Sequence, residues 1–167
     1  IKFISKETSN TPIKGITSKS HTSLITISSP EMIDQVGFAA KIYEILRHNN
    51  ISADVFSSSG VTLSNTIDPY VDDRKRKDEQ RDFTKLETSL KKYGDISIEK
   101  EKSIISLVGR GLIDTPGILA RVFTTVAKDN INVEMVSLGK NSCNLTFIVD
   151  QEYESKVVRS LHNEFFE

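Results

Sequence analysis

The chain has 167 residues, of which 37% are hydrophobic and 27% are charged, so it can form one medium-sized folded domain or two small ones. Its formal net charge of −1 argues against a nucleic-acid-binding surface, and no apolar run reaches the roughly 18 residues of a membrane span. The single cysteine, Cys143, excludes a disulfide framework and a cysteine-based zinc site, and it suits a reducing, cytoplasmic setting.

An internal repeat organises the chain. Residues 23–57 align without a gap on residues 103–137, at a constant offset of 80. The matching positions include a loop aspartate and glycine, Asp34 and Gly37 in the first copy, as well as apolar residues. Because turn residues match along with apolar ones, we interpret the chain as two copies of one structural unit.

The first copy begins with a β-rich run at 23–28 and a loop at 30–37. Apolar residues then recur at helical spacing and predict a helix that ends near 48–50, where asparagine suits a C-terminal cap. The residues expected on its buried stripe are Val36, Ala39, Ala40, Tyr43 and Leu46, widened by Phe38, Ile42 and Ile45.

Two strands, a second helix and a last strand complete this copy. Residues 51–57 alternate between apolar and polar, and a turn signal at 57–60 leads into a further strand that reaches Ile67. A charged loop is expected at 69–81. The apolar residues that mark the second helix and the last strand are Phe83, Leu86, Leu90, Tyr93, Ile96 and Ile98.

The element order β-α-β-β-α-β predicts an α+β protein made of ferredoxin-like units, each with two helices on one face of a four-stranded antiparallel sheet. The second copy has strands at 103–108, 131–135 and 145–149 and ends on a helix at 153–161. Thr115 is expected to cap its first helix. The stripe expected on that helix is Leu119, Val122, Phe123, Val126 and Ala127.

The second copy lacks a fourth strand before the chain ends. We expect the segment Pro12–Ser18, with Ile13 and Ile16, to supply it and to cover an otherwise exposed sheet edge. The predicted division is a linker and strand at 1–19 that joins the second domain, a first domain at 20–99 and a second domain at 100–167.

No catalytic or metal-ligating constellation is visible, and there is no phosphate-binding glycine loop. What recurs is a loop in which Asp34 and Gly37 precede a helix, whose free N–H groups and partial positive charge suit a carboxylate. Asp54, on the following strand, could complement an ammonium group. This is the charge pattern of a free α-amino acid, although a simple tight turn and a solvent-facing aspartate fit the residues equally well.

Longer runs carry a resemblance to a known family. Residues 22–27, 32–43 and 50–55 resemble the first ACT domain of aspartate kinases, especially the monofunctional lysine-sensitive type. Residues 114–119 are similar to the general ACT fingerprint, and residues 131–137 are similar to the second ACT domain of these enzymes. The end of the chain, from Leu161 onward, also resembles their carboxyl terminus, so the resemblance runs through both copies.

The resemblance implies that this fragment is not catalytic and that it mediates feedback control of aspartate kinase, which phosphorylates aspartate at the start of lysine, threonine and methionine synthesis. It implies an upstream kinase domain, where ATP and Mg would act, and no cofactor in this fragment. A free amino acid, lysine as first choice and threonine as second, would bind the first ACT domain at the interface of a homodimer.

The effector-binding positions implied by the resemblance are Met32, Asp34, Gln35, Gly37, Phe38, Ala39, Ala53, Asp54, Ser58, Ser59 and Gly60. A possible second effector site comprises Asp114, Thr115, Gly117, Ile118 and Leu119. At Gly60 the chain departs from lysine-sensitive relatives, which commonly carry a glutamate that helps to hold the lysine amine. Asp34 could substitute for it, whereas threonine needs no such partner.

Two other functions remain open. The chain could be an ACT-type sensor of a different enzyme or regulator. The same topology also serves RNA-binding modules, which need exposed aromatic residues on the central strands and a basic face. The corresponding strands carry Ile105, Leu107, Leu145 and Phe147, without an aromatic pair.

Overall fold

The computed structural model describes residues 2–4, 12–69, 82–112, 114–140 and 143–167. The chain divides into two compact units: unit 1 comprises Ile1–Ser20 and Glu101–Glu167, and unit 2 comprises His21–Lys100. The charged loop expected at 69–81 lies, beyond its first residue, outside the described residues.

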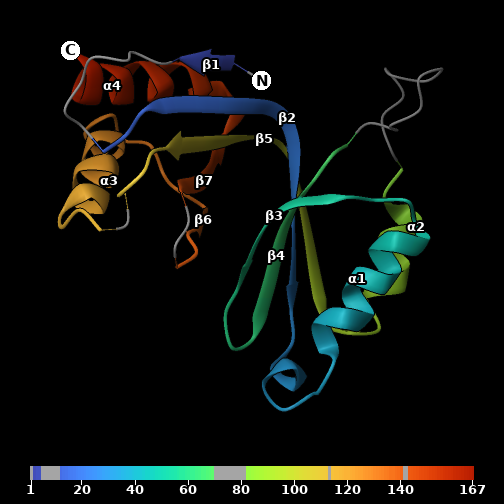
Figure 1. Cartoon of the computed structure of the whole chain (residues 1–167). Helices are drawn as coiled ribbons and strands as arrows, with labels where there is room; N and C mark the ends of the chain where they lie inside the picture. Colours follow the sequence, from blue (N-terminus) through green and yellow to red (C-terminus); the bar gives the residue numbers. More distant parts are fainter. Residues whose placement is uncertain (1, 5–11, 70–81, 113, 141–142) are drawn as a thin grey trace. The chain divides into compact units, whose positions relative to one another are not determined.

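Unit 2 is an antiparallel sheet with two helices on one face (Figure 1). Its strands are ordered β3-β4-β2-β5, and the core between sheet and helices includes Ile25, Phe38, Ile42, Leu86 and Leu90. Its elements are the second half of β2 (Gly15–Ser28), η1 (Pro30–Ile33), α1 (Phe38–His48), β3 (Ala53–Ser58), β4 (Thr62–Ile67), α2 (Thr84–Leu90) and the first half of β5 (Asp95–Val108).

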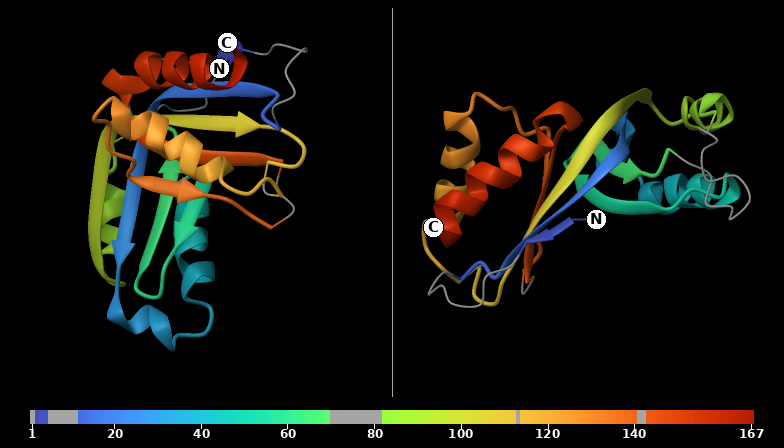
Figure 2. Two further views of the ribbon diagram at one scale, coloured as in Figure 1. Left: turned by 90° about the vertical axis from the view of Figure 1, so that its left-hand side faces the viewer. Right: turned by 90° about the horizontal axis from the view of Figure 1, so that it is seen from above.

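Unit 1 has the same arrangement, with α3 and α4 on one face of its sheet (Figure 2). Its further elements are β1 (Lys2–Ile4), α3 (Ile118–Lys128), β6 (Met135–Ser137), β7 (Asn144–Asp150), η2 (Gln151–Tyr153) and α4 (Glu154–Phe166). The strand order is β2-β5-β7-β6, with β1 antiparallel to β2. The first half of β2 therefore completes this sheet, as predicted, and Ile13 and Ile16 are fully buried in its core.

The backbone repeats as closely as the sequence does. Apart from glycine, positive φ occurs among the described residues at His21 (55°), Asn50 (52°), Glu101 (56°) and Asn130 (57°), two pairs separated by 80 residues. Gly37 and Gly117 form a third such pair, both with a φ of 80°. His21 and Glu101 lie within β2 and β5, at the residue where each strand passes from one unit to the other.

The buried stripe predicted for the first helix of each copy is wrong in part. In α1 the buried residues are Phe38, Ile42 and Leu46, whereas Val36 is 96% exposed. Val36 precedes Gly37, which caps the helix in a left-handed conformation, so it never joins the helical stripe. The small side chains of Ala39 and Ala40 are exposed, and the larger residues at i, i+4 and i+8 fill the core instead.

The same correction applies to α3, which buries Ile118, Val122 and Val126 and exposes Leu119 and Ala127.

Thr115 does not cap α3, contrary to the sequence expectation. The helix begins at Ile118 with Gly117 as its N-cap, and the Thr115 hydroxyl donates to the carbonyl of Gly111 at 2.8 Å. The strand expected from Ile131 is also shorter than predicted, since β6 covers only Met135–Ser137.

Candidate functional site

The loop before α1 leaves the positive end of a helix open. The 3-10 helix η1 ends at Ile33 with Asp34 as its C-cap, and the N–H group of Phe38 donates to the carbonyl of Gln35 at 3.2 Å. Gly37 caps the helix without any side-chain hydrogen bond, and no acidic residue occupies the first turn. Such an end attracts carboxylates, because the first N–H groups of a helix have no partner within it.

The backbone conformation at position 37 favours glycine, whereas the space around it would admit a side chain. A Cβ atom placed on Gly37 would meet nothing within 4 Å, but its φ of 80° lies in the left-handed region. Other residues adopt that region at a cost of about 1–2 kcal/mol. The side chain of Phe38 is 3% exposed and contacts Tyr93 edge to face, with ring centroids 6.3 Å apart, so it anchors the loop to the core.

The second part of the predicted site lies on β3 and its hairpin. Along β3 the side chains alternate, with Ala53 half-buried and Asp54, Phe56 and Ser58 exposed. The hairpin is closed by Ser59, whose N–H donates to the carbonyl of Thr62 at 2.9 Å. The β3–β4 hairpin and the loop that holds η1 lie at the same end of unit 2 (Figures 1 and 2).

All eleven predicted effector-binding residues thus fall in two segments of unit 2. Their exposed members are Asp34, Gly37, Ala39, Asp54, Ser58, Ser59 and Gly60, and their half-buried members are Met32, Gln35 and Ala53. Phe38 is buried and can offer a ligand only its main chain.

Three comparisons with known proteins bear on this geometry. A family model described as "ACT domain" matches residues 105–165, which lie in unit 1. Chloroplastic aspartokinase 2 of Arabidopsis thaliana is 32% identical over 164 residues, which cover 98% of this chain and 30% of that protein. The crystal structure of Clostridium acetobutylicum aspartate kinase superposes with a TM-score of 0.80 at 28% identity and covers 96% of this chain.

Residues 105–165 thus match the ACT-domain family model, and almost the whole chain is similar to part of known aspartokinases. A further solved relative is Escherichia coli aspartokinase III in complex with lysine and aspartate, with a TM-score of 0.77 and 25% identity over 97% of this chain. The chain spans about a third of these relatives, covering 36% of the Clostridium protein and 35% of the E. coli protein.

The second predicted loop, before α3, lies in unit 1. Asp114 and Gly117 are exposed, and Gly117 repeats the φ of 80° seen at Gly37. Thr115 is half-buried and bonded to its own loop, and Ile118 is buried in the core of unit 1. Leu119 is 37% exposed.

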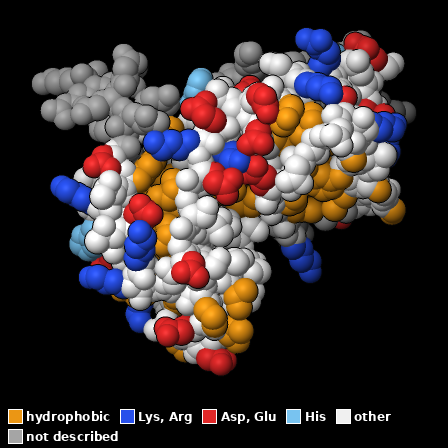
Figure 3. Space-filling view, turned by 180° about the vertical axis from the view of Figure 1, so that it is seen from behind, with side chains coloured by type: hydrophobic (Ala, Val, Ile, Leu, Met, Phe, Trp, Pro, Cys, Tyr) orange, Lys and Arg blue, Asp and Glu red, His pale blue; other side chains and the backbone are white. Residues whose placement is uncertain are grey.

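Sequence reasoning missed a set of exposed apolar side chains in unit 2. They lie on η1, on the loop before α1, on β3 and on its hairpin: Ile33 is 64% exposed, Val36 96%, Phe56 61% and Val61 41%. Figure 3 shows hydrophobic side chains on the surface at this end of the molecule. The sequence did contain one indication of this exposed apolar set. In the alternation of residues 51–57, Phe56 falls on the polar side of the strand.

The described residues give no support to a metal site or a membrane span. They contain no group of three or more metal-ligating side chains placed to hold an ion. None of the described helices combines the length and the apolar character needed to cross a bilayer.

Proposed function

We propose that this chain is the amino-acid-sensing region of an aspartate kinase and that its effector binds unit 2. The main-chain N–H groups between Gln35 and Ala39 take the effector carboxylate, and Asp54 takes its ammonium group. The observation that carries the proposal is the uncapped start of α1 at Gly37, with an exposed carboxylate on the neighbouring strand β3.

Lysine is the first candidate for the effector and threonine the second. The relative from E. coli was solved in complex with lysine and aspartate, which supports a lysine-type effector in this fold. A side-chain ammonium that becomes buried needs a carboxylate partner, because an unpaired charge is costly to desolvate. Lysine-sensitive relatives commonly carry that carboxylate as a glutamate at the position of Gly60. In this chain Asp34, which is exposed at the end of η1, supplies the carboxylate instead.

The effector site lies where two copies of the chain meet. The exposed apolar residues Ile33, Val36, Phe56 and Val61 belong to the same segments as the predicted site, and a second copy would remove them from water. Two arrangements of the dimer, bound by the effector with different affinities, would couple amino-acid level to enzyme activity.

The remaining parts of the proposal concern the whole protein. The kinase domain lies upstream and there uses ATP and Mg, whereas this region binds only a free amino acid. A reducing, cytoplasmic compartment suits the single exposed cysteine, Cys143.

Calorimetric titration of the chain with L-lysine and L-threonine tests the proposal. We expect lysine to bind, and the substitution Asp34→Asn to weaken lysine binding about tenfold without affecting threonine, as loss of one charge-assisted hydrogen bond predicts. Asp114→Asn, at the equivalent position of unit 1, is the matched control and should leave lysine binding unchanged. Absence of heat with both amino acids, from a folded dimer verified by light scattering, would contradict the proposal.

A further inference from the structure

Two polar side chains in the core of unit 2 lack hydrogen-bond partners. The hydroxyl of Ser23 and the amide nitrogen Nδ2 of Asn65 are buried, and neither has a partner among the described residues. Both residues are 0% exposed. A buried polar group without a partner is costly, because folding removes the water that solvates it in the unfolded chain. In folded proteins such groups are as a rule paired with another protein group or with an ordered water.

Ser23 and Asn65 lie close together on the face of the sheet that the helices cover. Ser23 of β2 is directly opposite Ile67 of β4, and Ile25 of β2 is directly opposite Asn65. Ile25 and Ile67 both belong to the core of unit 2. Since side chains alternate along a strand, Ser23 and Asn65 share this core face and occupy diagonal positions on it. Residues at such positions are about 7–8 Å apart, and their side chains can approach more closely.

Helix α1 determines which part of the Asn65 amide is left without a partner. The hydroxyl of Tyr43 donates to Oδ1 of Asn65 at 2.9 Å, so the amide oxygen is paired and the two N–H donors remain. The hydroxyl of Ser23 can accept a hydrogen bond as well as donate one. The two groups are complementary, yet they form no direct hydrogen bond. One small molecule between them that both accepts and donates would satisfy both.

We propose that a single buried water molecule bridges Asn65 and Ser23 in the core of unit 2. The water accepts a hydrogen bond from Nδ2 of Asn65 and donates one to the hydroxyl oxygen of Ser23. Two hydrogen bonds that meet at a water span roughly 5 Å, a separation that diagonal side chains can match. Immobilising one water costs less than leaving two buried groups unpaired. The bridge completes a chain of hydrogen bonds from α1 through β4 to β2.

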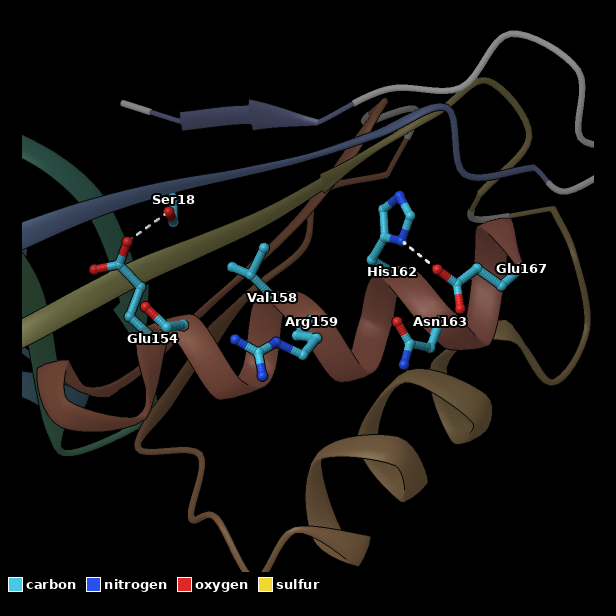
Figure 4. Close-up of a pocket in the computed structure, with 8 residues that line it drawn as sticks. Ser18, Glu154, Val158, Arg159, His162, Asn163 and Glu167 are labelled. Carbon is cyan, nitrogen blue, oxygen red and sulfur yellow. Dashed lines mark hydrogen bonds and ion pairs between the residues drawn. The ribbon is translucent and has the colours of Figure 1, made fainter.

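Unit 1 satisfies the equivalent serine with a side chain. Ser103, 80 residues after Ser23, donates to the buried carboxylate of Glu154 at 2.9 Å. The other oxygen of Glu154 accepts a hydrogen bond of 2.7 Å from Ser18, and Figure 4 shows Glu154 directed from α4 toward this residue of β2. The serine at this position of the repeated fold is therefore one that needs a partner inside the core.

Helix α2 offers no such carboxylate to Ser23. Leu86 in α2 and Val157 in α4 are the first buried apolar residues of their helices. Phe83, three residues before Leu86, therefore holds the position that Glu154 holds in unit 1. Phe83 is 7% exposed and belongs to the core of unit 2. Unit 2 thus keeps the serine but not its carboxylate partner, and a water takes the place of the carboxylate oxygen.

A crystal structure of the chain, at a resolution that shows ordered waters, tests the proposal. We expect a density peak within hydrogen-bonding distance of both Nδ2 of Asn65 and Oγ of Ser23. In solution, oxygen-17 relaxation dispersion counts long-lived buried waters, and Ser23→Val, which replaces the hydroxyl with methyl groups, should reduce that count by one. Thr125→Val is the matched control. It removes a buried hydroxyl of unit 1 that already donates to the carbonyl of Arg121, so the count should stay the same.

Ser23→Ala adds no atoms to the core and keeps the test decisive if Ser23→Val does not fold. It removes one of the two partners of the water, so it should shorten the residence time of that water about tenfold. A direct hydrogen bond between Asn65 and Ser23 in the crystal, with no density between them, would overturn the proposal. So would an unchanged count in Ser23→Val or an unchanged residence time in Ser23→Ala. No effector is present in these measurements, so their outcome is independent of the proposed function.

Discussion

Within unit 2 the hydroxyl of Tyr43 donates a hydrogen bond of 2.9 Å to Oδ1 of Asn65. In unit 1 the equivalent residues are Phe123 and Phe147, whose rings contact edge to face with centroids 5.7 Å apart. Asn65 and Phe147 hold the same register position in their sheets. One site of the repeated fold is thus filled by a polar pair in one copy and by an aromatic pair in the other.

Tyr43→Phe should therefore lower the free energy of unfolding by about 1–3 kcal/mol, because it leaves the buried amide of Asn65 without its donor. Asn65 is fully buried, and its Nδ2 already has no partner among the described residues. Urea denaturation checks the change. The double variant Tyr43→Phe with Asn65→Leu should recover much of the loss, since it removes both polar groups; equal stability of the single and double variants would contradict the argument.

The repeat, the element order and the strand contributed by the N-terminal segment were predictable from the sequence, because each rests on local periodicity and turn residues. The continuity of β2 and β5 was not. Each is a single strand of 14 residues that continues through a positive φ, at His21 and at Glu101. Positive φ is uncommon outside glycine, so the local sequence does not predict it at these two positions.

The buried charges of unit 1 were also invisible in the sequence. Lys102 and Glu154 look like ordinary surface residues until the fold brings them partners that lie 32 to 136 residues away in the chain. For the candidate site, the sequence indicated the loop at Gly37 and the strand with Asp54, but the apolar rim of Val36 and Phe56 emerged only from their exposure in the structure.

Lys102 offers a direct test of a buried ion pair. Its side chain is 6% exposed, and its ammonium group lies 2.6 Å from Glu134 and 2.8 Å from Asp150. Lys102→Met should destabilise the chain by about 3–5 kcal/mol in thermal or urea unfolding, because it leaves the carboxylate of Glu134 poorly solvated and without its partner.

The matched control is Lys156→Met, which removes a 3.3 Å ion pair to Asp129 from a side chain that is 54% exposed. Exposed pairs contribute about 0–1 kcal/mol. A similar loss of stability in both variants would show that burial does not distinguish the two pairs.

Asp129 should titrate at lower pH than an ordinary aspartate. The hydroxyl of Ser160 donates to its Oδ2 at 2.5 Å, and this bond, followed by the bond from Lys156, lowers the pKa of the Asp129 carboxyl. Because the pKa is lower in the folded state, the bond stabilises the protein above the unfolded pKa of about 4 and is lost as pH falls through the folded pKa.

Ser160→Ala should raise the Asp129 pKa toward its ordinary value in a carbon-detected NMR titration. Lys156→Met should raise it as well, since the hydrogen bond and the charge of Lys156 also lower the pKa of Asp129. An unchanged pKa in Ser160→Ala would contradict this assignment.

The proposed contact between copies predicts that Phe56→Ser weakens self-association. Phe56 is 61% exposed, so its loss should change the stability of a single copy by less than about 0.5 kcal/mol, yet raise the dimer dissociation constant at least about tenfold. Analytical ultracentrifugation measures the latter. Val136, 39% exposed at the equivalent position of unit 1, supplies the control Val136→Ser, which should leave self-association unaltered.

Gly37→Ala and Gly117→Ala distinguish the effect of the left-handed glycine on folding stability from its effect on effector binding. Both glycines have a φ of 80°, and a Cβ at either would meet nothing within 4 Å, so each substitution should cost about 1–2 kcal/mol of stability through backbone strain alone. Only Gly37→Ala should also weaken lysine binding in calorimetry, because relief of that strain reorients the N–H groups proposed to hold the carboxylate. If Gly117→Ala weakens lysine binding equally, the loop before α3 is an effector site as well, and the assignment of the effector to unit 2 alone is wrong.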